Sequence, residues 1–422
     1  MSNKEKKDVA ADTPNTIEEI VAATTIADVY KAAKNLDGVI KRTRLIESPF
    51  FSEISGNKVF IKPENLQNTG SFKLRGAYNK ICQLSNEDRA RGVITASAGN
   101  HAQGVGFAAQ HLGCKAVICM PATTPILKVE ATRAYGAEVV LFGDTFDDAA
   151  AKAIELQKEH GYIYIPPFDD KEVLLGQGTT ALEIIEELKD VDAILVPIGG
   201  GGFASGVAIA TKAVNPNVKV IGVEPAGAAC MDNAFKKGHV DTLPFVDTVA
   251  DGCAVKTPGQ LTYAFCKKYL DEIITVSEME IMSALLSLIE KHKLIAEGAG
   301  VLSLAALSKL TLKDQKVAAI VSGGNIDIST ISALINKALV DRGREFCFSV
   351  PLSDKPGQLL NIAKILSDEN ANVTKLDHNQ SQVTDSFKKV LLEVTCETHG
   401  HEHIARIIAA LEKAGYTINK IY

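Results

Sequence analysis

Short apolar segments alternate with amphipathic ones along most of this chain, from residue 59 to residue 326. The early apolar segments are only three to six residues long: 93–95, 115–120, 138–142 and 163–165. Segments of this length followed by helical patterns are typical of parallel strands that are joined by crossover helices. The pattern therefore predicts an α/β fold with open parallel sheets covered by helices on both faces.

A lysine lies at the start of one predicted helix, within the segment TGSFKLRGA at residues 69–77. Gly70 and Ser71 precede Lys73, and residues 74–80 read as a helix. At the positive end of a helix dipole the ammonium form is disfavoured and the nucleophilic amine is favoured. Such an amine can form a Schiff base with an aldehyde and can act as a base. Taken alone, however, this pattern more often belongs to a solvated surface lysine.

A glycine-rich loop follows the apolar strand that is predicted at residues 193–198. The loop consists of four consecutive glycines: Gly199, Gly200, Gly201 and Gly202. A strand, a glycine loop and then a helix direct backbone N–H groups and a helix N-terminus at a phosphate. An ordinary left-handed turn needs only one or two glycines. Four in a row therefore favour phosphate binding.

The same segment also fits the looser dinucleotide fingerprint through Gly199, Gly201 and Ala204. Glu224 closes the next predicted strand, 218–223, at the place where an acidic residue binds a ribose. An NAD-dependent dehydrogenase is therefore an alternative. Against it, this fingerprint normally belongs to the first βα unit of its domain, whereas here it lies near mid-chain.

Two further turns carry polar side chains after predicted strands. In the turn at residues 322–325 (SGGN), the hydroxyl of Ser322 could meet a ring nitrogen. Taken alone, this segment more often is an ordinary strand-to-helix turn with Asn325 or Asp327 as the helix cap. In the turn at residues 97–101 (SAGNH), backbone donors could hold a carboxylate, and Asn100 could donate to a phenolic oxygen. His101 is a possible base, but a histidine in the first turn of a helix more often has a structural role.

Together these segments resemble the fold-type II family of pyridoxal-phosphate enzymes, and within it the threonine (serine) ammonia-lyases, also called threonine dehydratases. The resemblance runs from about residue 25 to residue 344 and includes KPENLQ at 62–67 and EGAG at 297–300. It implies pyridoxal 5'-phosphate (PLP) as cofactor. It also implies deamination of L-threonine to 2-oxobutanoate and ammonia, with L-serine to pyruvate as a side activity.

The resemblance implies a role for each of these motif residues. Lys73 and Ser322 would be catalytic, since Lys73 binds the cofactor covalently and Ser322 faces its ring nitrogen. The implied cofactor-binding residues are Phe72, Lys73, Asn100, Gly199, Gly200, Gly201, Gly202, Glu297 and Ser322. The implied substrate-binding residues are Ser97, Ala98, Gly99, Asn100 and His101. A neutral serine cannot protonate the ring nitrogen as an aspartic acid would, which favours loss of the β-hydroxyl.

Other activities and functions are found on the same fold or close to it, and serine racemases differ from this chain at particular residues. Serine racemases of the family carry a second serine where this chain has Ala98, and alanine cannot transfer a proton. They also bind a divalent cation with a carboxylate pair, of which Glu224 is present but the second position is Cys230, so no metal is predicted. A β-replacing synthase of the same fold, and an amino-acid sensor without catalysis, stay open as alternatives.

The last 80 or so residues have a different pattern. Their predicted elements are strand 345–352, helix 356–368, strands 372–378 and 387–396, helix 401–414 and strand 417–421. The order βαββαβ is the ferredoxin-like arrangement. It resembles an ACT domain, including DKPGQL at 354–359. That resemblance implies an amino-acid effector such as isoleucine, or else a dimerisation module without an effector, and a homodimer or homotetramer. We interpret HGHEH at 399–403 as helix-capping residues rather than metal ligands.

The expected domains are a disordered tail 1–24, a large PLP-binding domain 25–91 and 169–344, a small domain 92–168, and an ACT-like regulatory domain 345–422. A net charge of −6 without a basic cluster gives no reason to expect a nucleic-acid partner. No apolar run is long enough to span a membrane, and the first 24 residues lack the apolar core of a signal peptide. Eight cysteines without a C-x-x-C pair predict reduced thiols and a cytoplasmic location.

Overall fold

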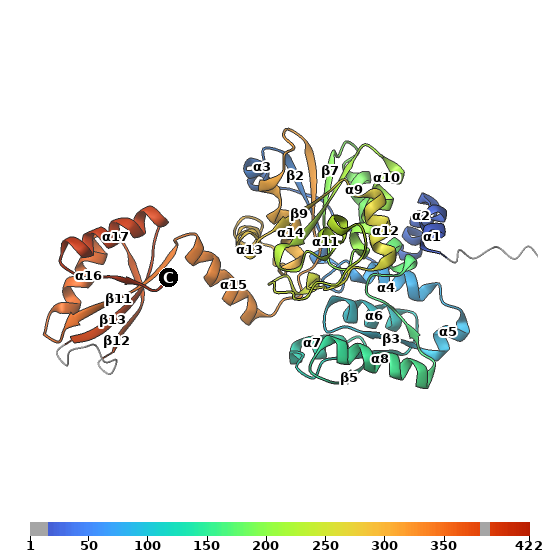
Figure 1. Ribbon diagram of the computed structural model, residues 1–422, viewed down its shortest axis with the longest axis horizontal. Helices are drawn as coiled ribbons and strands as arrows, with labels where there is room; N and C mark the ends of the chain where they lie inside the picture. The colour runs from blue at the N-terminus through green and yellow to red at the C-terminus, as the bar shows by residue number, and fades with distance from the viewer. Residues whose placement is uncertain (1–15, 380–388) are drawn as a thin grey trace, which may run out of the picture. The chain divides into compact units, whose positions relative to one another are not determined.

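The structure, a computed structural model, describes residues 16–379 and 389–422. The chain divides into two compact units, one ending at Ile326 and the other running from Asp327 to Tyr422 (Figure 1). This boundary lies earlier than the one expected after residue 344. The difference arises because helix α15 (Ile328–Asp341) groups with the second unit, where it contacts strand β11 (Glu345–Ser353).

The larger sheet of the first unit has six strands in the order β1-β2-β10-β7-β8-β9. Its strands are β1 (Ile46–Glu47), β2 (Lys58–Pro63), β7 (Ala193–Pro197), β8 (Lys219–Pro225), β9 (Glu272–Val276) and β10 (Lys316–Val321). Only β1 and β2 pair in antiparallel fashion; the other neighbours are parallel. Strand β7 is buried along its whole length, as expected of a central parallel strand.

The smaller sheet consists of four parallel strands in the order β5-β4-β3-β6. They are β3 (Val93–Ala96), β4 (Ala116–Met120), β5 (Glu138–Leu141) and β6 (Ile163–Tyr164). Val93 packs in one core cluster with Val105 of helix α6 (Asn100–His111), while Ile94 packs in another with Ala153 of helix α8 (Phe146–His160). Because successive strand residues point to opposite faces, helices cover both sides of this sheet (Figure 1). The structure thus confirms the predicted α/β architecture with parallel sheets.

Most of the first unit outside its sheets is helical. Its α-helices are α1 (Ile17–Ala23), α2 (Ile26–Leu36), α3 (Pro49–Ser55), α4 (Lys73–Cys82), α5 (Asn86–Arg91), α6 (Asn100–His111), α7 (Ile126–Arg133), α8 (Phe146–His160), α9 (Lys171–Glu187), α10 (Gly202–Val214), α11 (Cys230–Lys237), α12 (Gln260–Tyr269), α13 (Glu278–His292) and α14 (Leu302–Ala305). Its 3₁₀ turns are η1 (Glu64–Leu66), η2 (Ala226–Ala228), η3 (Asp251–Cys253), η4 (Ala299–Val301) and η5 (Leu307–Lys309).

Helix α1 corrects the expectation that residues 1–24 form a disordered tail. Thr16 and Glu19 form a capping box at its start, and Val21 is buried in the main core. Ile17 and Ile20 also pack against that core. The many charged residues nearby hid this short apolar face in the sequence. Residues 1–15 lie outside the described part of the chain.

Helices α4, α9 and α10 pack at backbone contact, and this packing positions the lysine and glycine motifs. A Cβ on Gly176 of α9 would lie 2.4 Å from the carbonyl oxygen of Arg75 in α4. A Cβ on Gly178 of α9 would lie 2.4 Å from the carbonyl oxygen of Gly206 in α10. Helix α9 therefore holds the helix that begins at Lys73 and the helix that follows the glycine loop at fixed spacing.

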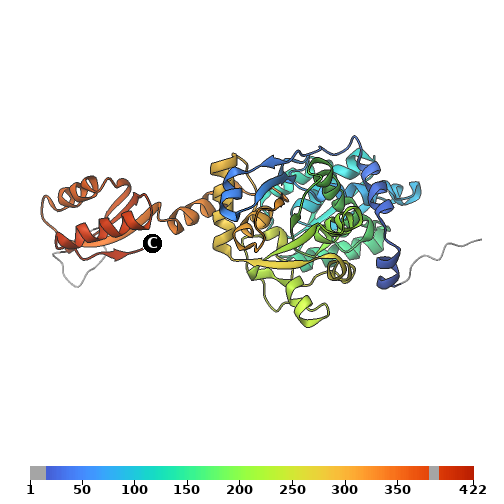
Figure 2. The same cartoon turned by 90° about the horizontal axis from the view of Figure 1, so that it is seen from above.

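The second unit folds as βαββαβ, as the sequence predicts. Its elements after α15 are β11, α16 (Gln358–Asp368), β12 (Asn372–Asn379), β13 (Lys389–Glu397), α17 (His401–Lys413) and β14 (Asn419–Lys420). The strands form an antiparallel sheet in the order β12-β13-β11-β14. Phe346, Val350 and Val394 of the sheet share a core with Leu366 of α16 and Ile407 of α17. Figure 1 and Figure 2 show the sheet and helices of this unit from two directions.

Three features of the described residues bear on the remaining sequence predictions. All eight cysteines lie in the described ranges and are free thiols, as predicted. No helix there is both long enough and apolar enough to cross a bilayer. In the segment HGHEH, the rings of His401 and His403 bind the carbonyl oxygens of Asp341 and Glu369.

Candidate active site

Lys73 is the first residue of helix α4, and its amine is held by a backbone carbonyl. The Nζ atom donates to the oxygen of Pro167 at 2.7 Å. Desolvation lowers the pKa of Lys73 to about 8, although the nearby Cys253 and Glu297 act in the opposite direction. The sequence predicts a lowered pKa because of the helix dipole, whereas in the structure the largest cause is desolvation. About a tenth of this amine is therefore neutral and nucleophilic at pH 7, far more than for an ordinary lysine.

The lowered pKa leads to a prediction about pH. The neutral amine of Lys73 gains population as the pH rises through about 8, whereas an ordinary lysine would need a pH of about 10.4. We therefore expect the rate at which the cofactor-free protein captures PLP covalently to rise with pH and to level off above about 8. Stopped-flow absorbance across this range measures it. A rate still rising tenfold per pH unit above 9 would contradict the lowered pKa.

The glycine loop lies against Phe168, which follows Pro167, the residue whose carbonyl accepts from Lys73. A Cβ on Gly200 would lie 2.5 Å from ring atoms of Phe168, and Gly201 has a left-handed φ of 94°. The hydroxyl of Thr262 also donates to the carbonyl oxygen of Gly200, at 2.6 Å. Helix α10 starts at Gly202 without a side-chain cap. Within residues 16–379 and 389–422, no acceptor binds the N–H groups of Gly200, Gly201 or Gly202. The loop thus offers several free donors at a helix N-terminus, which suits a phosphate.

Asn100, Glu297 and the turn at residues 322–325 meet directly. The side-chain amide nitrogen of Asn100 donates to Glu297 Oε1 at 2.6 Å, and its oxygen accepts from Asn325 at 2.7 Å. Desolvation raises the pKa of Glu297 to about 7, and the hydrogen bond from Asn100 opposes that shift. Ser322 is buried, its hydroxyl donates to the oxygen of Ala299, and its carbonyl accepts from the N–H of Phe72. These motifs, distant in the sequence, form one site.

The segment at residues 97–101 follows β3 and includes the first two residues of α6, and it is partly exposed except at His101. A Cβ on Gly99 would meet nothing within 4 Å, so the turn borders open space. The N–H of Gly99 is bound by Ser97 Oγ, and Ala98 packs on the edge of the small-sheet core. Free N–H groups at the start of α6 could hold a carboxylate there.

The side chains of His101 and Phe72 are engaged with protein groups. His101 Nε2 contacts the oxygen of Ile165 at 2.9 Å, and desolvation lowers the pKa of this histidine to about 3. A pKa this low makes the imidazole a weak proton acceptor, which argues against a role as a base. The ring of Phe72 stacks on Phe203, with centroids 3.8 Å apart.

Glu224 caps a helix. Its two carboxylate oxygens accept the N–H groups of Met231 and Asp232, both at 2.8 Å, in the first turn of α11. Burial raises the pKa of Glu224 to about 8. In the described ranges, no three His, Cys, Asp or Glu side chains are arranged to hold a metal. The feature that suggested a dinucleotide therefore has a structural explanation.

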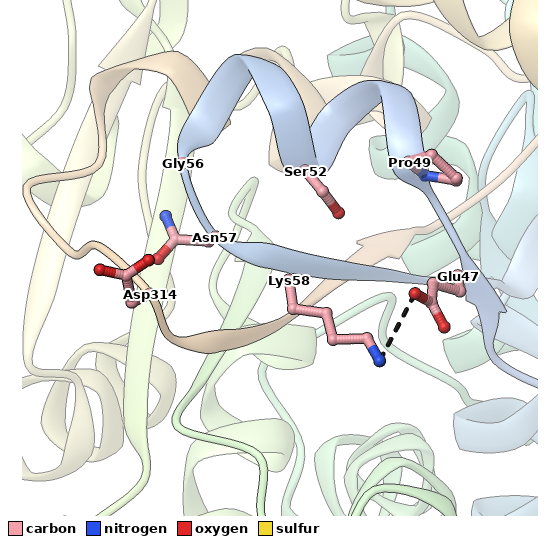
Figure 3. A pocket seen from close by; sticks show the side chains of 7 residues that line it. All are labelled: Glu47, Pro49, Ser52, Gly56, Asn57, Lys58 and Asp314. Carbon is pink, nitrogen blue, oxygen red and sulfur yellow. Dashed lines mark ion pairs between the residues drawn. The ribbon is translucent and has the colours of Figure 1, made fainter.

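A surface depression of about 460 Å³ lies elsewhere, along β1, α3 and β2 (Figure 3). Its lining includes an ion pair between Lys58 and Glu47 at 3.4 Å. None of the residues predicted for catalysis or binding lines it.

Sequence reasoning missed residues that act on this site through backbone atoms or from a distance along the chain. Pro167 accepts from Lys73, Phe168 packs on the glycine loop, and Asn325 holds Asn100. The only available signal was that Asn325 belongs to a recognised motif. Nothing in the sequence indicated that a carbonyl of Pro167 would meet the lysine.

The fold and the site together combine a lysine amine of lowered pKa with a glycine loop whose N–H groups are free, on two open α/β sheets. A model of the family described as "Pyridoxal-phosphate dependent enzyme" matches residues 36–323. The chain belongs to this family, and its cofactor is PLP. The available groups suit PLP, since an amine, a set of N–H donors for its phosphate and a neutral hydroxyl at Ser322 are all present.

Within the family, the chain is similar to threonine-deaminating enzymes. It is 46% identical over 397 residues to the L-threonine ammonia-lyase of Thermotoga maritima, covering 93% of this chain and 98% of that protein. Threonine deaminase isoform 2 from Solanum lycopersicum is 41% identical, with a TM-score of 0.70 over 74% of this chain and 94% of that one. Maize serine racemase is 34% identical, with a TM-score of 0.71 over 76% of this chain and 99% of that one.

Proposed function

We propose that this protein is a PLP-dependent threonine ammonia-lyase that converts L-threonine to 2-oxobutanoate and ammonia, with L-serine to pyruvate as a side activity. The observation that carries the proposal is the amine of Lys73, with its pKa lowered to about 8, held at the start of α4 near the glycine loop. The similarity to L-threonine ammonia-lyase over nearly the whole chain supports the choice of substrate.

When bound, PLP supplies an aldehyde and a conjugated ring that accepts electrons from the substrate's Cα. Lys73 would provide the amine that holds the cofactor and, once free, the base for the Cα proton. The N–H groups of Gly200–Gly202 would hold the phosphate, and those at the start of α6 would hold the substrate carboxylate. The neutral hydroxyl of Ser322 would face the ring nitrogen without protonating it, which would favour loss of the β-hydroxyl.

Racemisation is the nearest competing activity, because the maize protein named a serine racemase has a similar fold. The turn that would face the substrate carries Ala98, which has no proton to transfer. The carboxylate of Glu224 is engaged in capping α11. Both features favour elimination over racemisation.

The assay of 2-oxo acid release from L-threonine and L-serine by the PLP-loaded protein tests the proposal. We expect 2-oxobutanoate from threonine, at a higher kcat/KM than pyruvate from serine. Absence of both products despite bound PLP would overturn the proposal. In that case, formation of a new amino acid on adding sulfide would favour β-replacement, and formation of D-serine would favour racemisation.

We further propose that the second unit is an ACT-like regulatory domain, in a cytoplasmic homodimer or homotetramer. Its βαββαβ order supports this assignment. The alignment with the T. maritima enzyme covers 93% of the chain. Residues 1–326 make up a smaller share than this, so the alignment must extend into the second unit.

Removal of residues 346–422 provides the test of regulation. We expect isoleucine to bind the full chain and lower its activity, and we expect the truncated chain to lose isoleucine binding. Isothermal titration of both proteins measures the change. Equal affinity for isoleucine with and without these residues would exclude the second unit as the effector site.

A further inference from the structure

Three polar side chains form a hydrogen-bonded row beside the lysine motif. Asn325 Nδ2 donates to the backbone oxygen of Thr69 at 2.7 Å and to Asn100 Oδ1 at 2.7 Å. Asn100 Nδ2 then donates to Glu297 Oε1 at 2.6 Å. The row joins the segment before Lys73 to the start of α6 and to the turn that precedes η4.

The carbonyl at one end of the row fixes the direction of every bond in it. The backbone oxygen of Thr69 can only accept, so the amide nitrogen of Asn325 must lie on that side. The second N–H of this nitrogen then meets Asn100, whose facing atom must be its oxygen. The amide nitrogen of Asn100 therefore lies on the opposite side. One of its N–H groups binds Glu297, and the other is left for a different acceptor.

Glu297 alone could not fix this orientation, because a carboxyl group donates once it is protonated. Desolvation raises the pKa of Glu297 to about 7, so both forms occur near neutral pH. The charged or titratable groups that influence it are Lys73 of α4, Lys128 of α7, and Asp251 and Cys253 of η3. The backbone carbonyl of Thr69 does not titrate, so the anchor through Asn325 holds at every pH.

Two glycines leave room for the ends of the row. Gly70 has a left-handed φ of 72°, and a Cβ there would lie 2.4 Å from Asn325 Oδ1. A Cβ on Gly323 would lie 2.5 Å from Glu297 Oε1. At both positions any larger residue would displace a member of the row.

We propose that Asn325 is a positioning residue that sets the amide of Asn100 so that its free N–H, and not its oxygen, is directed at the phenolic oxygen of PLP. The inference rests on the proposed function, which places Asn100 at that oxygen. Asn325 touches Asn100 and the Thr69 backbone but acts on the cofactor only through Asn100.

Two substitutions at Asn325 distinguish orientation from packing. Asn325→Ala removes the anchor but leaves Glu297 to hold Asn100, so we expect the dissociation constant for PLP to rise about tenfold. Asn325→Asp keeps the shape of the side chain but has at most one donor, whereas the two acceptors are Thr69 O and Asn100 Oδ1. The carboxyl oxygens of the aspartate therefore favour a reversed Asn100 amide, whose nitrogen faces residue 325. In that orientation the oxygen of Asn100 is turned toward PLP. We therefore expect the aspartate variant to bind PLP more weakly than the alanine variant, with a shifted absorption maximum of the bound cofactor. A packing role predicts the reverse order.

The control is Asn65→Asp. Asn65 Nδ2 donates to the backbone oxygen of Ile295 at 2.8 Å, so this variant also loses an amide-to-carbonyl bond. Among the described residues, Asn65 forms no hydrogen bond with Asn100. We expect a changed melting temperature but an unchanged cofactor absorption maximum. Equal spectra for Asn325→Asp and Asn65→Asp would overturn the inference.

Asn100→Ala distinguishes a failure of the proposed role of Asn100 from a failure of the proposed role of Asn325. If this variant leaves PLP affinity and absorbance unchanged, the proposed placement of Asn100 at the cofactor is wrong. If it changes them while Asn325→Asp does not, only the role of Asn325 is wrong. In Asn325→Ala, orientation depends on the charge of Glu297, so we also expect a spectral transition near pH 7 that the natural protein lacks.

Discussion

Replacing Lys73 with alanine is expected to abolish the absorbance of covalently bound PLP and to lower turnover by at least about 10³-fold. Alanine can neither bind the cofactor's aldehyde nor remove the Cα proton. Helix α4 should persist, because alanine is the best helix former and Lys73 is its first residue. Absorbance spectra of the loaded protein and single-turnover assays with threonine measure the two losses.

The matched control is Lys80→Ala, in the same helix. Lys80 forms an ion pair with Asp170 at 2.7 Å and is partly exposed, so its loss should cost at most about 1 kcal/mol of stability. Bound PLP and turnover should stay near those of the natural chain. Near-normal turnover in Lys73→Ala, or an equal loss in both variants, would refute the assignment of Lys73.

The sequence was sufficient for features that depend on local pattern. The strand-to-helix alternation predicted the parallel sheets, and the βαββαβ order of the second unit followed from the spacing of its apolar runs. The motif containing Lys73 and the glycine run at 199–202 were each visible within a few residues, because the chemistry they need is set by backbone shape.

Features that depend on tertiary contact were not predictable from pattern. Nothing local indicates that Pro167 would accept from Lys73, or that Phe168 would pack on Gly200. The capping role of Glu224 depends on where helix α11 begins, and its position in the sequence suggested a ribose ligand instead. The apolar face of α1 was masked by charged neighbours.

The buried ions behind the active site give the second large prediction. Arg75 lies two residues after Lys73, with no exposed side-chain surface. Its guanidinium binds Glu64 through Nε at 2.7 Å and Nη2 at 2.8 Å, and binds Glu183 through Nη1 at 2.6 Å. Lys62 completes the cluster, with its amine 2.5 Å from Glu183. Two cations and two carboxylates thus balance one another inside the protein.

Burial disfavours the charged forms of both Arg75 and Glu64, but the attraction between these two charges outweighs that penalty. Burial acts to raise the pKa of Glu64, yet the charge and hydrogen bonds of Arg75 leave it lowered overall. For a carboxyl group with a lowered pKa in the folded state, the stabilisation is present above the unfolded value of about 4.3. It is lost as the pH falls through the lower folded value. Acid unfolding should therefore respond to Arg75.

Arg75→Met is expected to lower the free energy of unfolding by about 3–5 kcal/mol, because it leaves the carboxylate of Glu64 buried without its partner. The double variant Arg75→Met with Glu64→Gln removes one charge of each sign and leaves Lys62 paired with Glu183. Since a neutral replacement of a buried pair is often close to neutral in stability, most of the loss should be recovered. Urea unfolding of both variants and the natural chain measures this. If the double variant is as unstable as Arg75→Met, the loss comes from the shape of the arginine side chain and not from an unpaired charge.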